Sequence, residues 1–259
     1  MGKTKVFISD WQVLFREGIH FTLSGEEDVI VTGETTENRE ALDFLIGNPP
    51  DIAIVNINHG EYSGVKLTRY VRQNLPAVSV ILVMDTETDD RLYEALKCGA
   101  SACVSKDIDP DDLLVLIRQI TEGSVPVSRV MRQPSIASRI LDDFAAFTEL
   151  NNEVDSLLAV LTPREQELIK RISEKNDLPD IMKDLGIGEK DVDAVLKVIR
   201  GKLEINEHCR EVVEAAQRGL TSVIKRTRNG KKQDDYISRD EFESFRDSLI
   251  EHFRGFKER

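Results

Sequence analysis

The sequence has 259 residues, which is enough for two domains of ordinary size, each with its own core. A hydrophobic fraction of 40% and a charged fraction of 32% exclude a chain that is mostly disordered. The net charge of −12 excludes a protein that attracts nucleic acid by its overall charge. Any nucleic-acid binding therefore needs a locally basic surface.

The sequence contains no run of about 18 apolar residues and no signal-peptide pattern, so we expect a cytoplasmic protein. Its three cysteines are Cys98, Cys103 and Cys209, an odd number without a Cys-x-x-Cys pair. This usage is typical of a reducing compartment and argues against a disulfide framework or a zinc site. The sequence predicts no catalytic group, no metal site and no cofactor.

Five short, mostly β-branched apolar runs alternate with helical patterns in residues 1–122. The runs are Val6–Ile8, Val29–Val31, Ile52–Val55, Val78–Val83 and Ala102–Val104. This alternation predicts an α/β, doubly wound domain with a five-stranded parallel sheet covered on both faces. Ligands bind to such sheets at the carboxyl ends of the strands. The residues at these ends are Asp10, Trp11, Asn56, Met84 and Lys106.

Three segments resemble the receiver domain of response regulators, and within that family the NarL/FixJ type. They are Val6–Asp10, Pro50–Asn58, and Gly99–Ala100 followed by Lys106–Asp107. The resemblance implies a flavodoxin-like fold. It also implies a pocket with an acidic pair for Mg²⁺, an acceptor aspartate, a hydroxyl residue and a lysine. Asp10 and Lys106 match this pattern.

The other pocket positions depart from the pattern that the resemblance implies. Trp11 replaces the second acid, Asn56 the acceptor, Met84 the hydroxyl residue and Cys103 the switch aromatic on the fifth strand. A carboxamide is a poor nucleophile, and an indole cannot ligate Mg²⁺. The sequence thus predicts a pseudo-receiver that is not phosphorylated on aspartate.

What replaces the phosphate signal is open at this stage. Constitutive dimerisation, a partner protein and a ligand in the vacated pocket are all compatible with the sequence. Cys98 and Cys103 are compatible with a redox switch, but buried structural thiols are favoured because no neighbour in the sequence lowers a thiol pKa.

Residues 123–160 connect this domain to the next. Apolar residues recur there at helical spacing, namely Ile136, Ile140, Leu141, Phe144 and Phe147. The spacing predicts a helical linker with one apolar face. This face must pack on the protein itself or on a second copy, and packing within the chain is favoured.

Residues 161–220 have the pattern of a small all-α domain. Thr162 is a good N-cap, with Pro163 at the first helical position and Glu165 completing a capping box. Further helices are predicted over Leu178–Leu185, Glu189–Leu203 and Glu207–Arg218, with a turn at Gly186–Gly188. Leu161, Leu185–Val192 and Arg200–Leu203 resemble the LuxR-type helix-turn-helix domain. The resemblance implies DNA binding through the third helix of the domain, which is predicted over Glu189–Leu203.

The candidate DNA-binding residues on or beside that third helix are Lys190, Asp191, Asp193, Lys197, Arg200 and Lys202. Asp191 and Asp193 stand where the family usually has a hydroxyl and a basic or polar residue. A carboxylate repels DNA phosphates, although it can accept a hydrogen bond from cytosine. An ordinary solvated helix surface is the alternative interpretation of the basic residues.

Residues 221–259 extend beyond the family pattern. Lys225, Arg226, Arg228, Lys231 and Lys232 form a basic run that either contacts phosphates or is simply solvated. Ser238 and Glu241 then predict the start of an amphipathic helix. Its apolar face, with Phe242, Phe245, Leu249 and Phe253, is predicted to dock on the protein, a dimer mate or a partner.

The whole pattern predicts an atypical, phosphorylation-independent response regulator that binds DNA as a dimer and regulates transcription. It does not predict an enzyme, because no nucleophile or acid–base pair is assembled. The alternative is a protein-interaction adaptor that has lost DNA binding and engages a partner regulator through the C-terminal aromatic helix.

Overall fold

The computed structural model describes residues 2–57, 63–149, 158–174 and 177–229, and the side chains of these residues except 147–149 and 212–229. The C-terminal extension predicted beyond residue 229 therefore lies outside the described residues. No helix of the described residues is long and apolar enough to cross a membrane.

A five-stranded, fully parallel sheet forms the N-terminal part of the molecule, with strand order β2-β1-β3-β4-β5. The strands are β1 (Thr4–Ser9), β2 (Val29–Thr35), β3 (Ile52–Asn56), β4 (Ser79–Met84) and β5 (Ala102–Ser105). The central strand β3 is buried along its whole length, which explains its continuous apolar sequence. The predicted fold class is confirmed.

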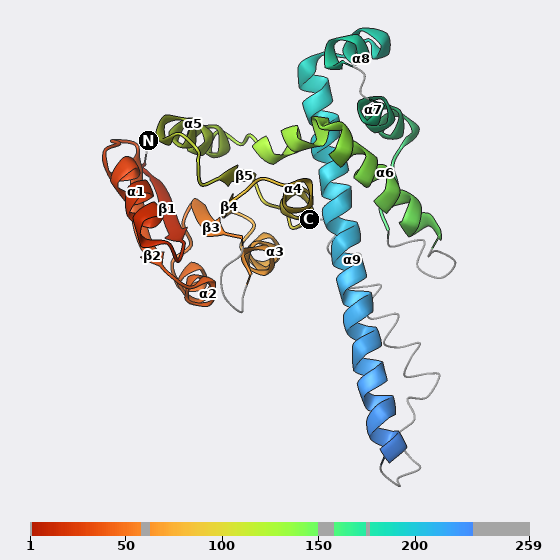
Figure 1. Ribbon diagram of the computed structural model, residues 1–259, viewed down its shortest axis with the longest axis horizontal. Coiled ribbons are helices and arrows are strands. Elements are labelled where there is room, and N and C mark those ends of the chain that lie inside the picture. The colour runs from red at the N-terminus through yellow and green to blue at the C-terminus, as the bar shows by residue number, and fades with distance from the viewer. Residues whose placement is uncertain (1, 58–62, 150–157, 175–176, 230–259) are drawn as a thin grey trace.

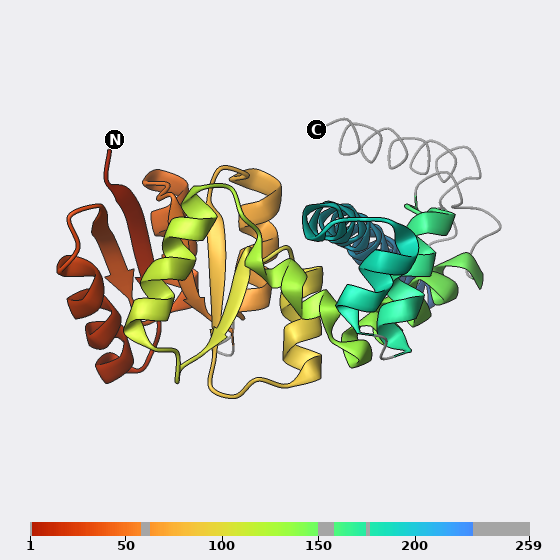
Figure 2. The same ribbon diagram turned by 90° about the horizontal axis from the view of Figure 1, so that it is seen from above.

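Helices cover both faces of the sheet, because successive side chains of each strand point to opposite faces. The helices are α1 (Val13–Ser24), α2 (Asn38–Gly47), α3 (Gly64–Asn74), α4 (Asp89–Lys97) and α5 (Pro110–Thr121). Residues of α1 and α5 pack with Val6 and Ile8 on one face. Residues of α2, α3 and α4 pack with Phe7 on the other. The layers are visible in Figure 2.

The linker consists of a 3₁₀ helix, η1 (Pro126–Arg132), followed by α6 (Pro134–Glu149). The sequence did not predict η1, whose Val127 N–H donates to the carbonyl of Ser101 over 3.0 Å. On α6, Ile136 and Ile140 are fully buried and belong to the same core as α4. The prediction that the apolar face of the linker packs within the chain is confirmed.

In the described residues after the linker, the helices are α7 (Pro163–Ser173), α8 (Leu178–Leu185) and α9 (Glu189–Asn229). The predicted capping box is present at the start of α7, where Thr162 N–H donates to the Glu165 carboxylate over 2.7 Å. Gly186 ends α8 with a φ of +62°, in the left-handed region that glycine adopts without strain. The chain then turns directly into α9.

The prediction of two separate helices over Glu189–Leu203 and Glu207–Arg218 is wrong, because α9 is continuous. Asn206 precedes the expected second start but does not cap a helix. Its side-chain amide instead bonds the backbone N–H and carbonyl of Ala159, at 2.8 and 2.9 Å. No proline interrupts α9, so nothing local forces a break. Figure 1 shows α9 extending well beyond the neighbouring helices.

The N-terminal and C-terminal parts share one core cluster. Leu196, Ile199 and Leu203 of α9 belong to the cluster that also contains residues of α3 and α4. Along its length, α9 contacts α4, η1 and α7, and Figure 1 shows it passing beside α4. The face of α9 that meets the sheet domain is therefore set by tertiary packing.

Candidate functional site

Asp10, Asn56 and Lys106 come together at the carboxyl ends of β1, β3 and β5, as the sequence predicts. The Asn56 amide donates to Asp10 Oδ2 over 2.7 Å. Lys106 Nζ lies 3.2 Å from the same oxygen and 3.0 Å from Asp85 Oδ1. The pocket is thus closed by contacts among its own side chains.

Asp10 is only 2% exposed, yet it has a full set of partners. Its Oδ1 accepts the backbone N–H of Gln12 over 2.7 Å, and Lys106 provides the countercharge. Burying a carboxylate without such partners would be costly. Asp85, which directly follows β4, was missed by the sequence reasoning, although an acid beside the Met84 position was a visible signal.

Trp11 does not point a ligand into the pocket but covers Lys106. The ammonium lies 5.5 Å from the Trp11 ring centroid and 5.3 Å from that of Phe15, within the range of cation–π attraction. Trp11 is 47% exposed. Met84 is fully buried in the core and adds no polar atom to the pocket.

The donor set of this pocket does not fit Mg²⁺, the ion that a receiver pocket implies. Mg²⁺ requires near-octahedral oxygen ligands, with carboxylates among them. Asp10 is already neutralised by Lys106, Asp85 is paired with the same lysine, and Trp11 offers no oxygen. Among the described residues, no group of three or more His, Cys, Asp or Glu side chains is placed to hold a metal ion.

The cysteines behave as structural thiols. Burial raises the pKa of the Cys98 thiol to about 12. Burial first, and then Glu87, raises the pKa of the partly buried Cys103 thiol to about 12 as well. Cys209 is also buried. At neutral pH, Cys98 and Cys103 are therefore protonated, which disfavours the redox switch that the sequence left open.

The two aspartates at the start of α9 both have structural partners. Asp191 accepts the N–H of Gly188 over 2.9 Å and so caps the helix. Asp193 pairs with Arg132 of η1 at 2.6 Å, and Glu189 pairs with the same guanidinium at 3.2 Å. The sequence did not predict this ion pair with the linker, because Arg132 lies 61 residues away.

Lys190 and Lys197 are exposed on α9, but Arg200 and Lys202 are not free to contact a ligand in this arrangement. Arg200 is 7% exposed and donates to the carbonyl of Ala100 over 3.0 Å. Burial lowers the pKa of Arg200, and its Glu204 ion pair opposes this shift. Lys202 bonds the Glu165 carboxylate over 2.6 Å and thereby ties α9 to α7.

An ion-pair cluster joins α9 to α3 and α4. Arg69 pairs with Glu211 and, at 3.1 Å, with Glu207. The same Glu207 lies 2.8 Å from Lys97 Nζ. Next to it, Arg72 pairs with Glu204 at 3.4 Å. The partners are more than 100 residues apart, so helical periodicity alone could not reveal them.

Gly99 permits this close approach of α9. Its φ of +85° lies in the left-handed region, and an added Cβ would come within 2.8 Å of Arg72 Cγ and 3.1 Å of Glu204 Oε2. The Gly99–Ala100 motif thus contributes twice to the contact. Gly99 leaves space for Glu204 of α9, and the carbonyl of Ala100 accepts a hydrogen bond from Arg200.

The side chains of the remaining predicted site residues are not among those that the structure describes. Lys225, Arg226 and Arg228 lie within the last turns of α9, where side chains are not described. The other predicted residues lie outside the described residues, namely Lys231, Lys232, Phe242, Phe245, Leu249 and Phe253.

Comparison with known proteins identifies the N-terminal part. Residues 6–118 match the family described as the response regulator receiver domain. The transcriptional regulatory protein YxjL of Bacillus subtilis is 23% identical over 218 residues, covering 84% of this chain and 97% of YxjL. The transcriptional regulatory protein NarL of Mycobacterium tuberculosis is 24% identical, covering 84% of this chain and 96% of NarL. The solved NarL receiver domain is 25% identical with a TM-score of 0.44, covering 47% of this chain and 96% of that chain.

Proposed function

We propose that this response regulator of the NarL type regulates transcription by binding DNA, without phosphorylation of an aspartate in its receiver domain. The observation that carries the proposal is the closed pocket, in which the Asn56 amide and the Lys106 ammonium satisfy Asp10. The acceptor position is occupied by Asn56, which has no carboxylate. At the metal position, the carboxylate of Asp10 is already paired with Lys106. The receiver then acts as a packing partner of α9.

Phosphorylation independence follows from the chemistry of the side chains. Phosphoryl transfer relies on a metal ion and a charged nucleophile to stabilise the developing charge. Asn56 has no negative charge, and its amide oxygen is a weaker nucleophile than the carboxylate oxygen of an aspartate. Lys106 occupies the space next to Asp10 as an internal cation. We infer that the charges of Asp10 and Lys106 already balance each other in the absence of a phosphoryl group.

DNA binding is supported by the relatives and by the helical part. Both relatives cited above are named as transcriptional regulatory proteins. The order of α8, the turn at Gly186 and α9 is the one that a helix-turn-helix requires, and Lys190 and Lys197 are exposed near the start of α9. Two exposed lysines near the groove would provide phosphate contacts.

The present arrangement is a closed one with respect to DNA. Arg200 is buried against the receiver, and Arg132 of the linker covers Glu189 and Asp193. Contact of this whole face with DNA requires α9 to move away from the receiver and η1. The signal that opens this contact then takes the place of the phosphoryl group.

The first experiment mixes the full-length protein with fragmented genomic DNA at near-physiological salt and sequences the retained fragments, because affinity depends on salt. A common, roughly palindromic sequence is expected, since a dimer reads two half-sites. The matched control is a Lys190→Glu variant, which should retain less DNA. Because the described arrangement is closed, the Arg132→Ala variant, which removes the contact of η1 with α9, is tested in parallel. Enrichment of no sequence by either folded protein would contradict the proposal.

The adaptor is the second candidate, and it is favoured by the structural partners of Asp191, Asp193 and Arg200. In that case the helix-turn-helix is a packing module, and a partner protein binds elsewhere on the chain. An Asp191→Thr, Asp193→Lys double variant distinguishes the two functions. DNA affinity appearing where none existed supports the adaptor, whereas a changed sequence preference supports the DNA reader.

The double variant also breaks the pair between Asp193 and Arg132, so it needs a control that breaks only this pair. Arg132→Ala is suitable, because it opens the same contact and leaves the surface of α9 unchanged. A gain of DNA binding that Arg132→Ala reproduces comes from opening. A gain seen only in the double variant comes from the altered helix surface.

A further inference from the structure

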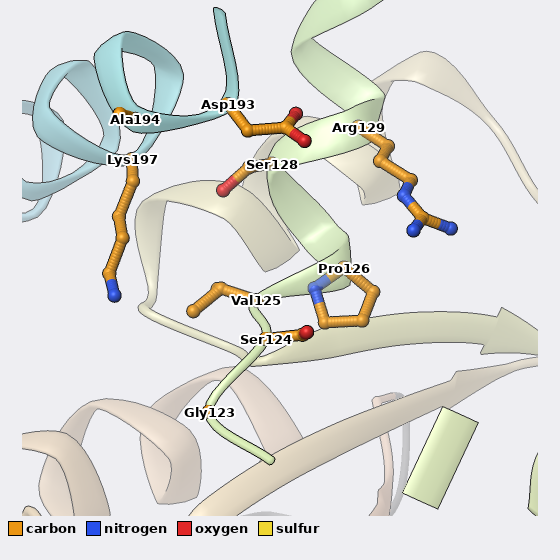
Figure 3. Close-up of a pocket in the computed structure, with 9 residues that line it drawn as sticks. All are labelled: Gly123, Ser124, Val125, Pro126, Ser128, Arg129, Asp193, Ala194 and Lys197. Carbon is orange, nitrogen blue, oxygen red and sulfur yellow. The ribbon is translucent and has the colours of Figure 1, made fainter. Parts of the chain in front are cut away.

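A small pocket lies between the linker and the first turns of α9. Its volume is about 210 Å³, and its walls come from two segments that are far apart in the chain. Residues 123–126, Ser128 and Arg129 form one wall, while Asp193, Ala194 and Lys197 form the other, as Figure 3 shows. Any molecule that binds there contacts both η1 and α9.

The pocket contains a buried hydroxyl that lacks a partner. Ser128 is only 5% exposed, and among the described residues no group forms a hydrogen bond with its Oγ atom. In Figure 3 this hydroxyl points toward the side of the pocket where Lys197 lies. A buried polar atom without a partner is unfavourable, so the site is suited to a molecule or ion that accepts or donates a hydrogen bond.

The charges around this hydroxyl favour an anion. Figure 3 shows Lys197 on the side to which the Ser128 hydroxyl points, whereas the Arg129 side chain extends away from that hydroxyl. Neither residue forms an ion pair with a described residue. The carboxylate of Asp193 is offset by Arg132 at 2.6 Å. The lining therefore offers the uncompensated ammonium of Lys197 on the side of Ser128, with Arg129 and the hydroxyl of Ser124 as further lining donors.

We propose that this pocket, lined by Ser128, Arg129 and Lys197, binds a phosphate-class oxyanion, either inorganic phosphate or the phosphate group of a small metabolite. Ammonium, guanidinium and hydroxyl donors are the groups that hold phosphate oxygens in proteins. The volume accommodates a phosphate with a short organic substituent. Because the ligand bridges η1 and α9, it stabilises their contact by linkage. The inference does not depend on whether α9 binds DNA.

The test is calorimetric titration of the full-length protein with inorganic phosphate and, separately, with glycerol 3-phosphate, at matched ionic strength. Saturable binding is expected, with a Kd below about 10 mM for at least one of the two ligands. Preference for inorganic phosphate identifies the free ion, and preference for glycerol 3-phosphate identifies a phosphorylated metabolite. Hydrogen exchange of residues 190–200 should slow in the presence of the ligand that binds.

Two variants locate the binding in this pocket. Lys197→Gln and Ser128→Ala should each weaken it by about tenfold or more. The matched control is Lys183→Gln, which removes an exposed lysine of α8 outside the pocket and should leave binding unchanged. Ser128→Ala removes a buried hydroxyl without a partner, so loss of folding does not confuse the result. Absence of binding by both ligands, or unchanged affinity in the Lys197 and Ser128 variants, overturns the proposal.

Discussion

At the scale of single residues, the charge of Asp10 is balanced within the chain. The Asn56 amide and the Gln12 N–H supply hydrogen bonds, and Lys106 supplies the countercharge. Each of these contacts has ordinary hydrogen-bond geometry. A pocket satisfied in this way has no electrostatic requirement for an external ion.

The wild-type protein should therefore gain no phosphoryl group from acetyl phosphate and Mg²⁺. Intact mass spectrometry after incubation measures this directly. A receiver domain with an acceptor aspartate, treated in parallel, is the positive control. A mass increase of one phosphoryl group, mapped to the residues of this pocket, would contradict phosphorylation independence.

Asn56→Asp should lower the free energy of unfolding near pH 7 by about 1–3 kcal/mol, because it replaces a hydrogen bond with two adjacent carboxylates. The Coulomb repulsion between the two carboxylates opposes folding, and the Lys106 ammonium offsets only part of it. Denaturant unfolding measures the loss of stability, with Asn48→Asp at an exposed position as the control.

The thiols of Cys98 and Cys103 should be alkylated very slowly in the folded protein. With pKa values of about 12, both are protonated near pH 8, and the thiol form is unreactive. Iodoacetamide labelling followed by peptide mapping should show at least a hundredfold lower rate, on the order set by the thiolate fraction, than in denaturant. Rapid labelling of either thiol in the folded chain would revive the redox switch.

At the scale of elements, α9 shows that contacts outside a helix decide where it ends. Asn206 has a side chain suited to capping, but its amide pairs with the backbone of Ala159. Glu204 and Glu207, on either side of it, face basic residues of α3 and α4. A break in this region would separate these partners, so a single helix is favoured over two short ones.

Arg200→Ala should lower the free energy of unfolding by about 3–5 kcal/mol, because it leaves the buried Ala100 carbonyl without its donor and removes one of the two ion pairs of Glu204. Chemical denaturation followed by circular dichroism measures the change. Arg164→Ala, which removes an exposed arginine of α7, is the control and should cost less than about 0.5 kcal/mol. Similar costs for the two variants would mean that the buried contact contributes little.

At the scale of the whole molecule, the receiver, the linker and the helical part are held together by one apolar core and one ion-pair cluster. Apolar packing sets the stability of this contact, and the charged pairs set which faces meet. Since the charged pairs are partly exposed, salt weakens them. The contact is therefore the element whose opening would change the accessible surface of α9.

Replacing Arg69 and Arg72 together with Ala should loosen α9 from the receiver without unfolding either part. Hydrogen exchange of residues 204–211 should accelerate severalfold, and added salt should reproduce part of the effect in the wild-type protein. Arg16→Ala is the matched control, because it removes a partly buried, paired arginine of the receiver that does not contact α9. Unchanged exchange in the double variant would show that apolar packing alone holds the contact.

The elements that could be predicted from the sequence are those whose signals are local. Apolar runs defined the five strands, Thr162 and Glu165 defined the start of α7, and strand ends located Asp10, Asn56 and Lys106. These features depend on periodicity, capping and the topology of parallel sheets, all of which can be read from neighbouring residues.

The partners that side chains find across long separations in the sequence depend on how the helices pack on the sheet. Asp85 joined Lys106, Arg132 joined Asp193, and Arg200 became buried against Ala100. Nothing in the local pattern distinguishes these charged residues from solvated ones, because their environment arises when α9 packs on the receiver. The physical reason is that burial and Coulomb attraction depend on distance in space, whereas sequence patterns report only distance along the chain.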